Sequence, residues 1–203
     1  MVKVGITGGI GSGKTTVCKV WESMGAVVVY ADDLAKKLMV DDDELITKVI
    51  SAFGELSYHE DGTLNRQYLA TKAFKKGEVE KLNKIVHPAV VRKVKELMER
   101  AEAQGADLFA EEAALLLSKG RPKIFDYIVI VTADKTDRLK WVKERDGSGQ
   151  DEIIARMRKQ QSFEELMPLC DFVIENDSTV HSLKRKAEDL YRQMLKLQNT
   201  GVD

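Results

Sequence analysis

The sequence lacks the features that mark membrane, secreted and nucleic-acid-binding chains. No apolar run approaches the roughly 20 residues that a membrane-spanning helix needs. The first apolar run begins directly after Met1, which predicts that there is no signal peptide. The formal net charge is only −1, so the composition calls for neither nucleic acid nor a membrane surface as a partner. We therefore expect a cytoplasmic protein, and no feature indicates an obligate protein partner.

Cysteine and histidine are also scarce. The two cysteines, Cys18 and Cys170, are isolated within apolar patterns, which favours buried, reduced thiols. The three histidines are scattered, and no Cys/His spacing suggests a zinc site. With 203 residues, 43% of them hydrophobic, the chain can bury one substantial core and a smaller appendage.

What the chain does have is a phosphate-binding motif at its start. The apolar run Val2–Thr7 predicts a strand, and the residues that follow fit G-x-x-x-x-G-K-[ST] before a helical pattern. The backbone N–H groups of such a loop, and the start of the next helix, bind phosphate oxygens. The pattern assigns ATP binding to Gly8, Gly9, Ile10, Gly11, Ser12, Gly13, Lys14, Thr15 and Thr16. Within it, Lys14 is expected to reach the β- and γ-phosphates as a catalytic residue, and the Thr15 hydroxyl to bind Mg²⁺. The structural alternative is a glycine turn that only joins strand to helix.

Further short apolar runs, rich in β-branched residues, predict buried strands. They are Ala26–Tyr30, Leu108–Ala110, Tyr127–Val131 and Phe172–Ile174. Helical patterns separate them, which favours a three-layer α/β/α fold with a five-stranded parallel sheet.

Two stretches interrupt this alternation. Residues 33–105 carry helical patterns without a comparable strand, and Pro88 is expected at the first position of a helix that stops near Gly105. A basic stretch at 143–165 contains the flexible turn Asp146–Gly149. We predict a nucleotide-binding core formed by 1–32, 106–142 and 166–203, a helical substrate domain at 33–105 and a short helical lid at 143–165.

Several short motifs occur in an order and spacing that are specific together. They are Thr7–Val17, Ala31-Asp32, Gly62-x-Leu64-x-Arg66, Leu82-x-x-Ile85-x-His87-Pro88, Arg145-Asp146, Ala155-Arg156-x-x-x-Gln160 and Asp171-Phe-Val-Ile-x-Asn176. With them the chain resembles the dephospho-coenzyme A kinase family over nearly its whole length. The resemblance implies an adenylate-kinase-like P-loop fold. It also implies transfer of the ATP γ-phosphoryl, with Mg²⁺, to the ribose 3′-hydroxyl of dephospho-coenzyme A. That reaction gives coenzyme A and ADP, as the last step of coenzyme A biosynthesis.

Other functions stay open at this point. Spacing alone indicates only a P-loop kinase, so another small-molecule, nucleoside or nucleotide kinase of the same fold is the alternative. A GTP-dependent switch is disfavoured, because Asp134–Asp137 and Asp146–Gly149 imitate its two motifs in the wrong order. A relative that binds nucleotide without turnover is the remaining possibility.

Individual roles follow from position and from the resemblance. Asp32, just after the second strand, is expected to act as general base and to contact the acceptor; a helix cap is the alternative. Glu112, or less favourably Glu111, is expected to hold Mg²⁺ at the end of the third strand, unless it is a solvated carboxylate. Arg145 is expected to be a catalytic cation of the lid, and Arg138 and Arg156 are expected to bind ATP. For each of the three, an exposed ion pair with a nearby acid is the alternative. Asn176 is expected to contact adenine, or else to form a turn.

The acceptor side rests mainly on the resemblance, which implies substrate contacts for Arg66 and His87. For His87, just before Pro88, a capping or core role is the alternative. Three departures from the family's usual pattern stand out. Tyr30 replaces the first acid of Asp-Ala-Asp, and Trp141 stands where a lid arginine is common, with Arg138 and Lys140 nearby. Glu112-Ala113-Ala114-Leu115-Leu116 occupies the place of Asp-x-Pro-Leu-Leu.

Overall fold

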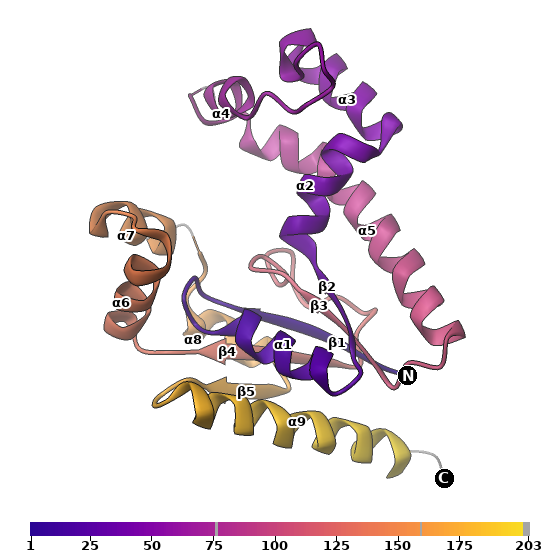
Figure 1. Ribbon diagram of the computed structural model, residues 1–203, viewed down its shortest axis with the longest axis vertical. Coiled ribbons are helices and arrows are strands. Elements are labelled where there is room, and N and C mark those ends of the chain that lie inside the picture. The colour runs from indigo at the N-terminus through magenta and orange to yellow at the C-terminus, as the bar shows by residue number, and fades with distance from the viewer. Residues whose placement is uncertain (76, 159, 201–203) are drawn as a thin grey trace. The chain divides into compact units, whose positions relative to one another are not determined.

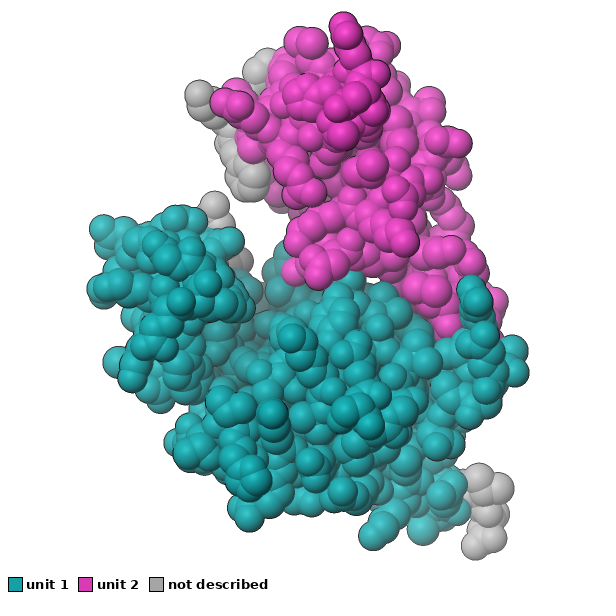
Figure 2. Space-filling model, in the orientation of Figure 1, with its two compact units in different colours: residues 1–30, 100–203 teal, residues 31–99 magenta. Residues whose placement is uncertain are grey.

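The chain folds into two compact units, which are described separately below. The computed structural model describes residues 1–75, 77–158 and 160–200, with only the backbone described at 73–75. The first unit combines Met1–Tyr30 with Arg100–Asp203, and the second is Ala31–Glu99 (Figure 2).

A five-stranded sheet forms the centre of the first unit (Figure 1). Its strands are β1 (Val2–Gly8), β2 (Val27–Tyr30), β3 (Leu108–Glu112), β4 (Tyr127–Thr132) and β5 (Phe172–Glu175). They lie in the order β2-β3-β1-β4-β5, and every neighbouring pair is parallel. The predicted α/β fold with a five-stranded parallel sheet is confirmed. Because the strands are parallel, their carboxyl ends meet at one edge, where open α/β sheets bind ligands.

Two helices cover one face of this sheet. Helix α1 (Lys14–Ser23) packs against α9 (Val180–Thr200), and both contribute to one buried cluster with alternate residues of the strands. Trp21 is fully buried there, and its indole N–H donates to the Ala187 carbonyl at 2.9 Å. This hydrogen bond joins α1, the helix that follows the glycine loop, to α9.

The opposite face is covered partly by irregular chain. A Cβ at Gly5 would lie 2.6 Å from the Leu116 side chain and 3.1 Å from that of Phe125, so the segment between β3 and β4 packs directly on the middle of β1. The short elements α8 (Phe163–Leu166) and η2 (Met167–Leu169) precede β5. Asp171 fixes the start of the neighbouring strand, because its carboxylate accepts the Ile128 N–H at 2.7 Å and pairs with Arg121 at 2.7 Å.

Both cysteines are free thiols. Cys18 is fully buried, and burial raises the pKa of its thiol well above the usual range. Cys170 is only half-buried, and burial raises the pKa of its thiol to about 11. Both thiols therefore stay protonated and unreactive at neutral pH.

A helical hairpin follows β4. Helix α6 (Lys135–Asp146) begins where the Asp134 carboxylate accepts the Thr136 N–H at 2.7 Å, and α7 (Gln150–Arg158) packs against it. Gly147, with φ of +66°, ends α6 in a left-handed conformation. The hairpin thus starts at the Asp134 cap, upstream of the predicted lid boundary at residue 143.

The second unit contains helices around a small core of its own. They are α2 (Ala31–Asp41), α3 (Asp43–Phe53), η1 (Glu55–Ser57), α4 (Arg66–Lys75) and α5 (Val79–Ala103), whose last turn belongs to the first unit. The Asp42 carboxylate caps α3 by accepting the Leu45 N–H at 2.9 Å. The Tyr58 hydroxyl donates to the Met39 carbonyl at 2.7 Å.

The start of α5 differs from the prediction. The helix begins at Val79, so His87 and Pro88 lie inside it and Pro88 is not its first residue. A proline in a helix interior removes one backbone hydrogen bond and costs about 3 kcal/mol or more. The apolar stripe continues on both sides of it, with Val86, Val90 and Val94 buried. Packing of these side chains outweighs the free-energy cost of the proline. A prediction based on the proline alone does not include this packing.

Among the residues that the structure describes, no helix is both long and apolar enough to cross a bilayer.

Candidate nucleotide site

The glycine loop connects β1 to α1 and is held by close backbone packing. Gly8 has a φ of +147°, and a side chain there would collide with the Val131 carbonyl of β4. Gly11 has a φ of +79°, and its Cβ would lie 2.7 Å from the Val142 side chain and 2.9 Å from the Arg138 carbonyl. Helix α6 therefore lies along the outside of the loop, and only glycine allows this approach.

Lys14 and Glu112 meet at the mouth of the loop. The Lys14 ammonium donates to the carbonyls of Gly8 at 3.0 Å and Gly9 at 3.3 Å, and lies 3.6 Å from the Glu112 carboxylate. The two side chains are only 10% and 13% exposed. Glu112 is therefore not a solvated strand-end carboxylate. A buried carboxylate beside a loop lysine is one that can take part in binding a phosphate–cation complex.

Glu111 has a different environment from its neighbour. Successive side chains in a strand point to opposite faces, so Glu111 faces away from Lys14 and Glu112. Burial raises the pKa of the Glu111 carboxyl to about 7. Because burial favours the protonated form of Glu111, which also faces away from Lys14, Glu112 is the better candidate for a metal ligand.

Arg138 reaches the loop from α6. Its guanidinium lies against Gly9, where an added Cβ would collide with Nη1, and stacks 4.7 Å from the centre of the Phe163 ring. Its Nε–H is buried and has no hydrogen-bond partner in the described part of the chain. Burial lowers the pKa of this guanidinium, and the negative charge of the nearby Asp134 opposes that shift; an arginine stays charged at neutral pH. The site thus has a fixed cation beside the glycine loop.

Arg145 and Arg156 both lie against Asp146 at the junction of α6 and α7. Arg145 donates to both carboxylate oxygens, at 2.7 and 3.0 Å, and Arg156 lies 3.6 Å from one of them. Their side chains are 60% and 50% exposed. These are the ion pairs considered as an alternative to a catalytic role, although Arg145 also lines a cleft beside Gly13 and Thr16.

Asn176 is buried directly behind the loop. Its side-chain N–H donates to the Ser12 carbonyl at 3.1 Å, and its backbone N–H donates to Thr132 at 2.8 Å. It also borders a cleft of about 410 Å³ beside Gly13 and Thr16. Asn176 thus holds the loop in place, a role that its position after a strand did not reveal.

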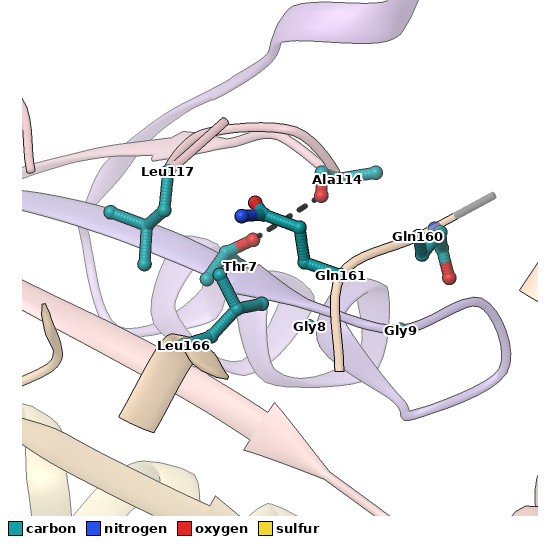
Figure 3. A pocket seen from close by; sticks show the side chains of 8 residues that line it. All are labelled: Thr7, Gly8, Gly9, Ala114, Leu117, Gln160, Gln161 and Leu166. Carbon is teal, nitrogen blue, oxygen red and sulfur yellow. Dashed lines mark hydrogen bonds between the residues drawn. The ribbon is translucent and has the colours of Figure 1, made fainter. Parts of the chain in front are cut away.

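Gln160 is a loop contact that the sequence analysis did not single out. Its side-chain oxygen accepts the Ile10 N–H at 2.8 Å, which ties the chain after α7 to the glycine loop. Figure 3 shows Gln160 and Gln161 beside Gly8 and Gly9, around a small pocket closed by Thr7 and Ala114. The only signal in the sequence was its place in the motif Arg156-x-x-x-Gln160.

The residues expected on the acceptor side belong to the second unit. Asp32 lies in the first turn of α2 and is exposed. Among the described residues, no hydrogen bond from a backbone N–H to the Asp32 carboxylate is seen, so the structure shows no helix cap there. Arg66 is the first residue of α4 and is exposed, whereas His87 is half-buried within α5.

Tyr30 stands at the end of β2, opposite Glu112 of β3. Its hydroxyl donates to the Glu22 carboxylate at 3.1 Å. Burial raises the pKa of the phenol further above its usual range, so the position is neutral at physiological pH.

Comparisons with known proteins agree over most of the chain. The sequence model of the dephospho-CoA kinase family matches residues 2–182. A Salinibacter ruber protein named dephospho-CoA kinase is 46% identical, with 94% of this chain and 96% of that protein covered. A solved structure of TT1252 from Thermus thermophilus is 30% identical with a TM-score of 0.76, and covers 95% of this chain and 97% of that one. Dephospho-CoA kinase from Campylobacter jejuni shares the fold at 22% identity and a TM-score of 0.64, over 95% and 96% of the two chains. The chain belongs to the dephospho-CoA kinase family.

Proposed function

We propose that this protein transfers the γ-phosphoryl group of ATP to the ribose 3′-hydroxyl of dephospho-coenzyme A, releasing ADP and coenzyme A. The observation that carries the proposal is the glycine loop with Lys14 buried beside Glu112, in a chain that belongs to this kinase family from residue 2 to residue 182. In the reaction the acceptor O3′ forms a bond to the γ-phosphorus while the bond from that phosphorus to the β–γ bridging oxygen breaks.

The loop and Lys14 supply positioning and charge. The backbone N–H groups between Gly8 and Thr16 and the N-terminus of α1 bind the β- and γ-phosphates. The Lys14 ammonium, now shared between two loop carbonyls and Glu112, reorients toward the phosphate oxygens. Phosphoryl transfer needs this neutralisation more than covalent help from the protein.

Arg138 is the cation that we favour near the transferred group. Its guanidinium lies at Gly9 beside the loop, whereas Arg145 and Arg156 are bound to Asp146. A cation held in position stabilises negative charge that develops in the transition state without reorganisation. Arg145 and Arg156 act in the same way only if closure of the α6–α7 hairpin separates them from Asp146.

The donor set suits Mg²⁺ bound together with a nucleotide. No group of three or more His, Cys, Asp or Glu side chains that could hold a metal ion occurs among the described residues. A hydroxyl and one carboxylate suit an ion that takes its other ligands from water and the nucleotide phosphates. The Thr15 hydroxyl at the start of α1 and the Glu112 carboxylate would hold it. Bound there, Mg²⁺ would supply positive charge that offsets the charge of the nucleotide phosphates.

Asp32 is the proposed general base. Its carboxylate accepts the proton of the attacking 3′-hydroxyl and orients that oxygen toward the γ-phosphorus. An acceptor can reach this carboxylate, because Asp32 is exposed in the first turn of α2. Arg66 and His87, also in the second unit, are proposed to contact the acceptor, Arg66 through a phosphate group that suits its forked guanidinium. The cytoplasmic location stays a prediction.

A coupled assay of ADP release tests the proposal. Mg·ATP is supplied with dephospho-coenzyme A, AMP, adenosine or no acceptor, and the product is identified by mass. We expect ADP release above background only with dephospho-coenzyme A. Equal release with AMP or adenosine would favour another kinase of this fold, and no release above the acceptor-free background would contradict the proposed activity.

A further inference from the structure

Trp141 lies where the family commonly has a lid arginine, and it borders the cleft beside the glycine loop. We propose that Trp141 is the surface on which the nucleotide base stacks, so that the base and the triphosphate are bound by separate residues of α6. The inference rests on the proposed use of ATP and adds the residue that binds its base.

The cleft is continuous with the phosphate site. It is lined by loop residues Gly13 to Thr16, by Trp141 and Arg145 of α6, and by Asn176 and Val180. A nucleotide whose phosphates bind the loop therefore has its base and sugar within reach of this cleft. The volume of about 410 Å³ falls in the range of small-molecule sites.

The walls of the cleft suit a flat aromatic ligand. Trp141 is the aromatic side chain among the residues that line it, and Val180 there is 63% exposed. A purine has apolar faces and polar edges, so an indole ring and an aliphatic side chain can cover the faces while Asn176 borders the edge.

Trp141 is not needed to fill the core. It is half-buried, whereas the other tryptophan, Trp21, is fully buried and hydrogen-bonded to the Ala187 carbonyl. A large aromatic side chain left partly open at the rim of a cleft has stacking area to offer a ligand.

Arg138 accounts for the charge that a tryptophan at position 141 cannot supply. A lid arginine combines a flat stacking face with a positive charge, and tryptophan keeps only the flat face. In this chain the guanidinium of Arg138 lies at Gly9, one helical turn before Trp141 on α6. The two functions are thus divided between Arg138 and Trp141.

Two tryptophans in distinct surroundings make the inference measurable by fluorescence. Mg·ATP should quench the emission of Trp141, whereas Mg·tripolyphosphate, which has no base, should leave it nearly unchanged. In Trp141→Phe the response to ATP should disappear, because the remaining Trp21 is buried away from the cleft. An unchanged emission on saturation of the native protein with Mg·ATP would contradict the stacking.

Affinities from calorimetry give the second readout. Trp141→Ala should weaken ATP binding by about 5- to 100-fold, the cost of one lost base–aromatic stack. The same variant should bind tripolyphosphate as the native protein does, and Trp141→Phe should keep most of the ATP affinity. Glu144→Ala, an exposed position on α6, is the control for damage to the helix and should leave both affinities unchanged.

The outcomes separate this inference from the proposed function. Native ATP affinity in Trp141→Ala, or an equal loss of ATP and tripolyphosphate affinity, would overturn the stacking role even in an enzyme that makes coenzyme A. ATP binding on Trp141 without phosphorylation of dephospho-coenzyme A would overturn the proposed function alone.

Discussion

At the residue scale, two adjacent acids, Asp32 and Asp33, have different surroundings. Asp33 pairs with Lys36 at 2.6 Å on the surface of α2, whereas the structure shows no such ion pair for Asp32 among the described residues. We predict that Asp32→Asn lowers kcat by about 100-fold or more, the usual contribution of a general base, without changing ATP affinity. The matched variant Asp33→Asn should keep native turnover, since exposed ion pairs contribute little. Single-turnover kinetics with both variants would settle the assignment, and near-native turnover in Asp32→Asn would show that the base is elsewhere.

Glu111 allows a prediction about pH and stability. Burial raises the pKa of its carboxyl to about 7 in the folded protein, so the folded state holds a proton that the unfolded chain has released. The native protein therefore loses stability as the pH rises from about 4.5 to 7, and no more is lost above that. Glu111→Gln carries no charge and escapes this loss. Its gain in unfolding free energy over the native protein should be roughly 2–3 kcal/mol larger at pH 8 than at pH 5.

Urea unfolding of both proteins at the two pH values measures this difference. Glu175→Gln, at an exposed position of β5, is the control for replacing a glutamate in the same sheet. A Glu111→Gln gain that is the same at pH 5 and pH 8 would mean that the Glu111 carboxyl titrates in its ordinary range.

At the element scale, the hydrogen bond from the Ile10 N–H to Gln160 connects the end of the α6–α7 hairpin to the glycine loop. We predict that Gln160→Leu lowers kcat/KM for ATP by about 2- to 10-fold, because one neutral hydrogen bond contributes about 0.5–1.5 kcal/mol. Gln161 lines the same small pocket without a described hydrogen bond to the loop (Figure 3), so Gln161→Leu should be near native. Steady-state kinetics that show equal effects for the two variants would remove the specific role of Gln160.

The elements also show what sequence patterns can and cannot predict. The sequence predicts the strands because short β-branched runs such as Tyr127–Val131 are typical of strands buried on both faces of a sheet. The predicted start of α5 at Pro88 is wrong. Tertiary packing of a long apolar stripe outweighs the local effect of this proline, so the helix begins at Val79.

In the candidate site, too, some features follow from local sequence and others do not. The sequence predicts the loop from its glycine positions, which depend on local backbone geometry. The Gln160 hydrogen bond and the contact of Asn176 with Ser12 join residues far apart in sequence, and a local pattern does not encode them. The difference between Glu111 and Glu112 depends on which face of the sheet each one reaches, and adjacent identical residues give no sign of it.

At the scale of the whole molecule, the two units are expected to bind different substrates. The glycine loop and the α6–α7 hairpin lie in the first unit, whereas Asp32, Arg66 and His87 lie in the second. We predict that a non-hydrolysable ATP analogue slows amide hydrogen exchange in residues 8–16 and in α6. Dephospho-coenzyme A should instead slow exchange in α2 and α4. Protection by the acceptor confined to the first unit would contradict the assignment of residues 33–105 as a substrate domain.

The central claim is transfer to one particular oxygen, the ribose 3′-hydroxyl. The most direct test is phosphorus–proton correlation NMR of the product formed from Mg·ATP and dephospho-coenzyme A. The account predicts a new phosphate coupled to the 3′ proton of the ribose, in an amount equal to the ADP released. A phosphate on the 2′ oxygen, or ADP release without any new phosphate ester on the acceptor, would contradict it.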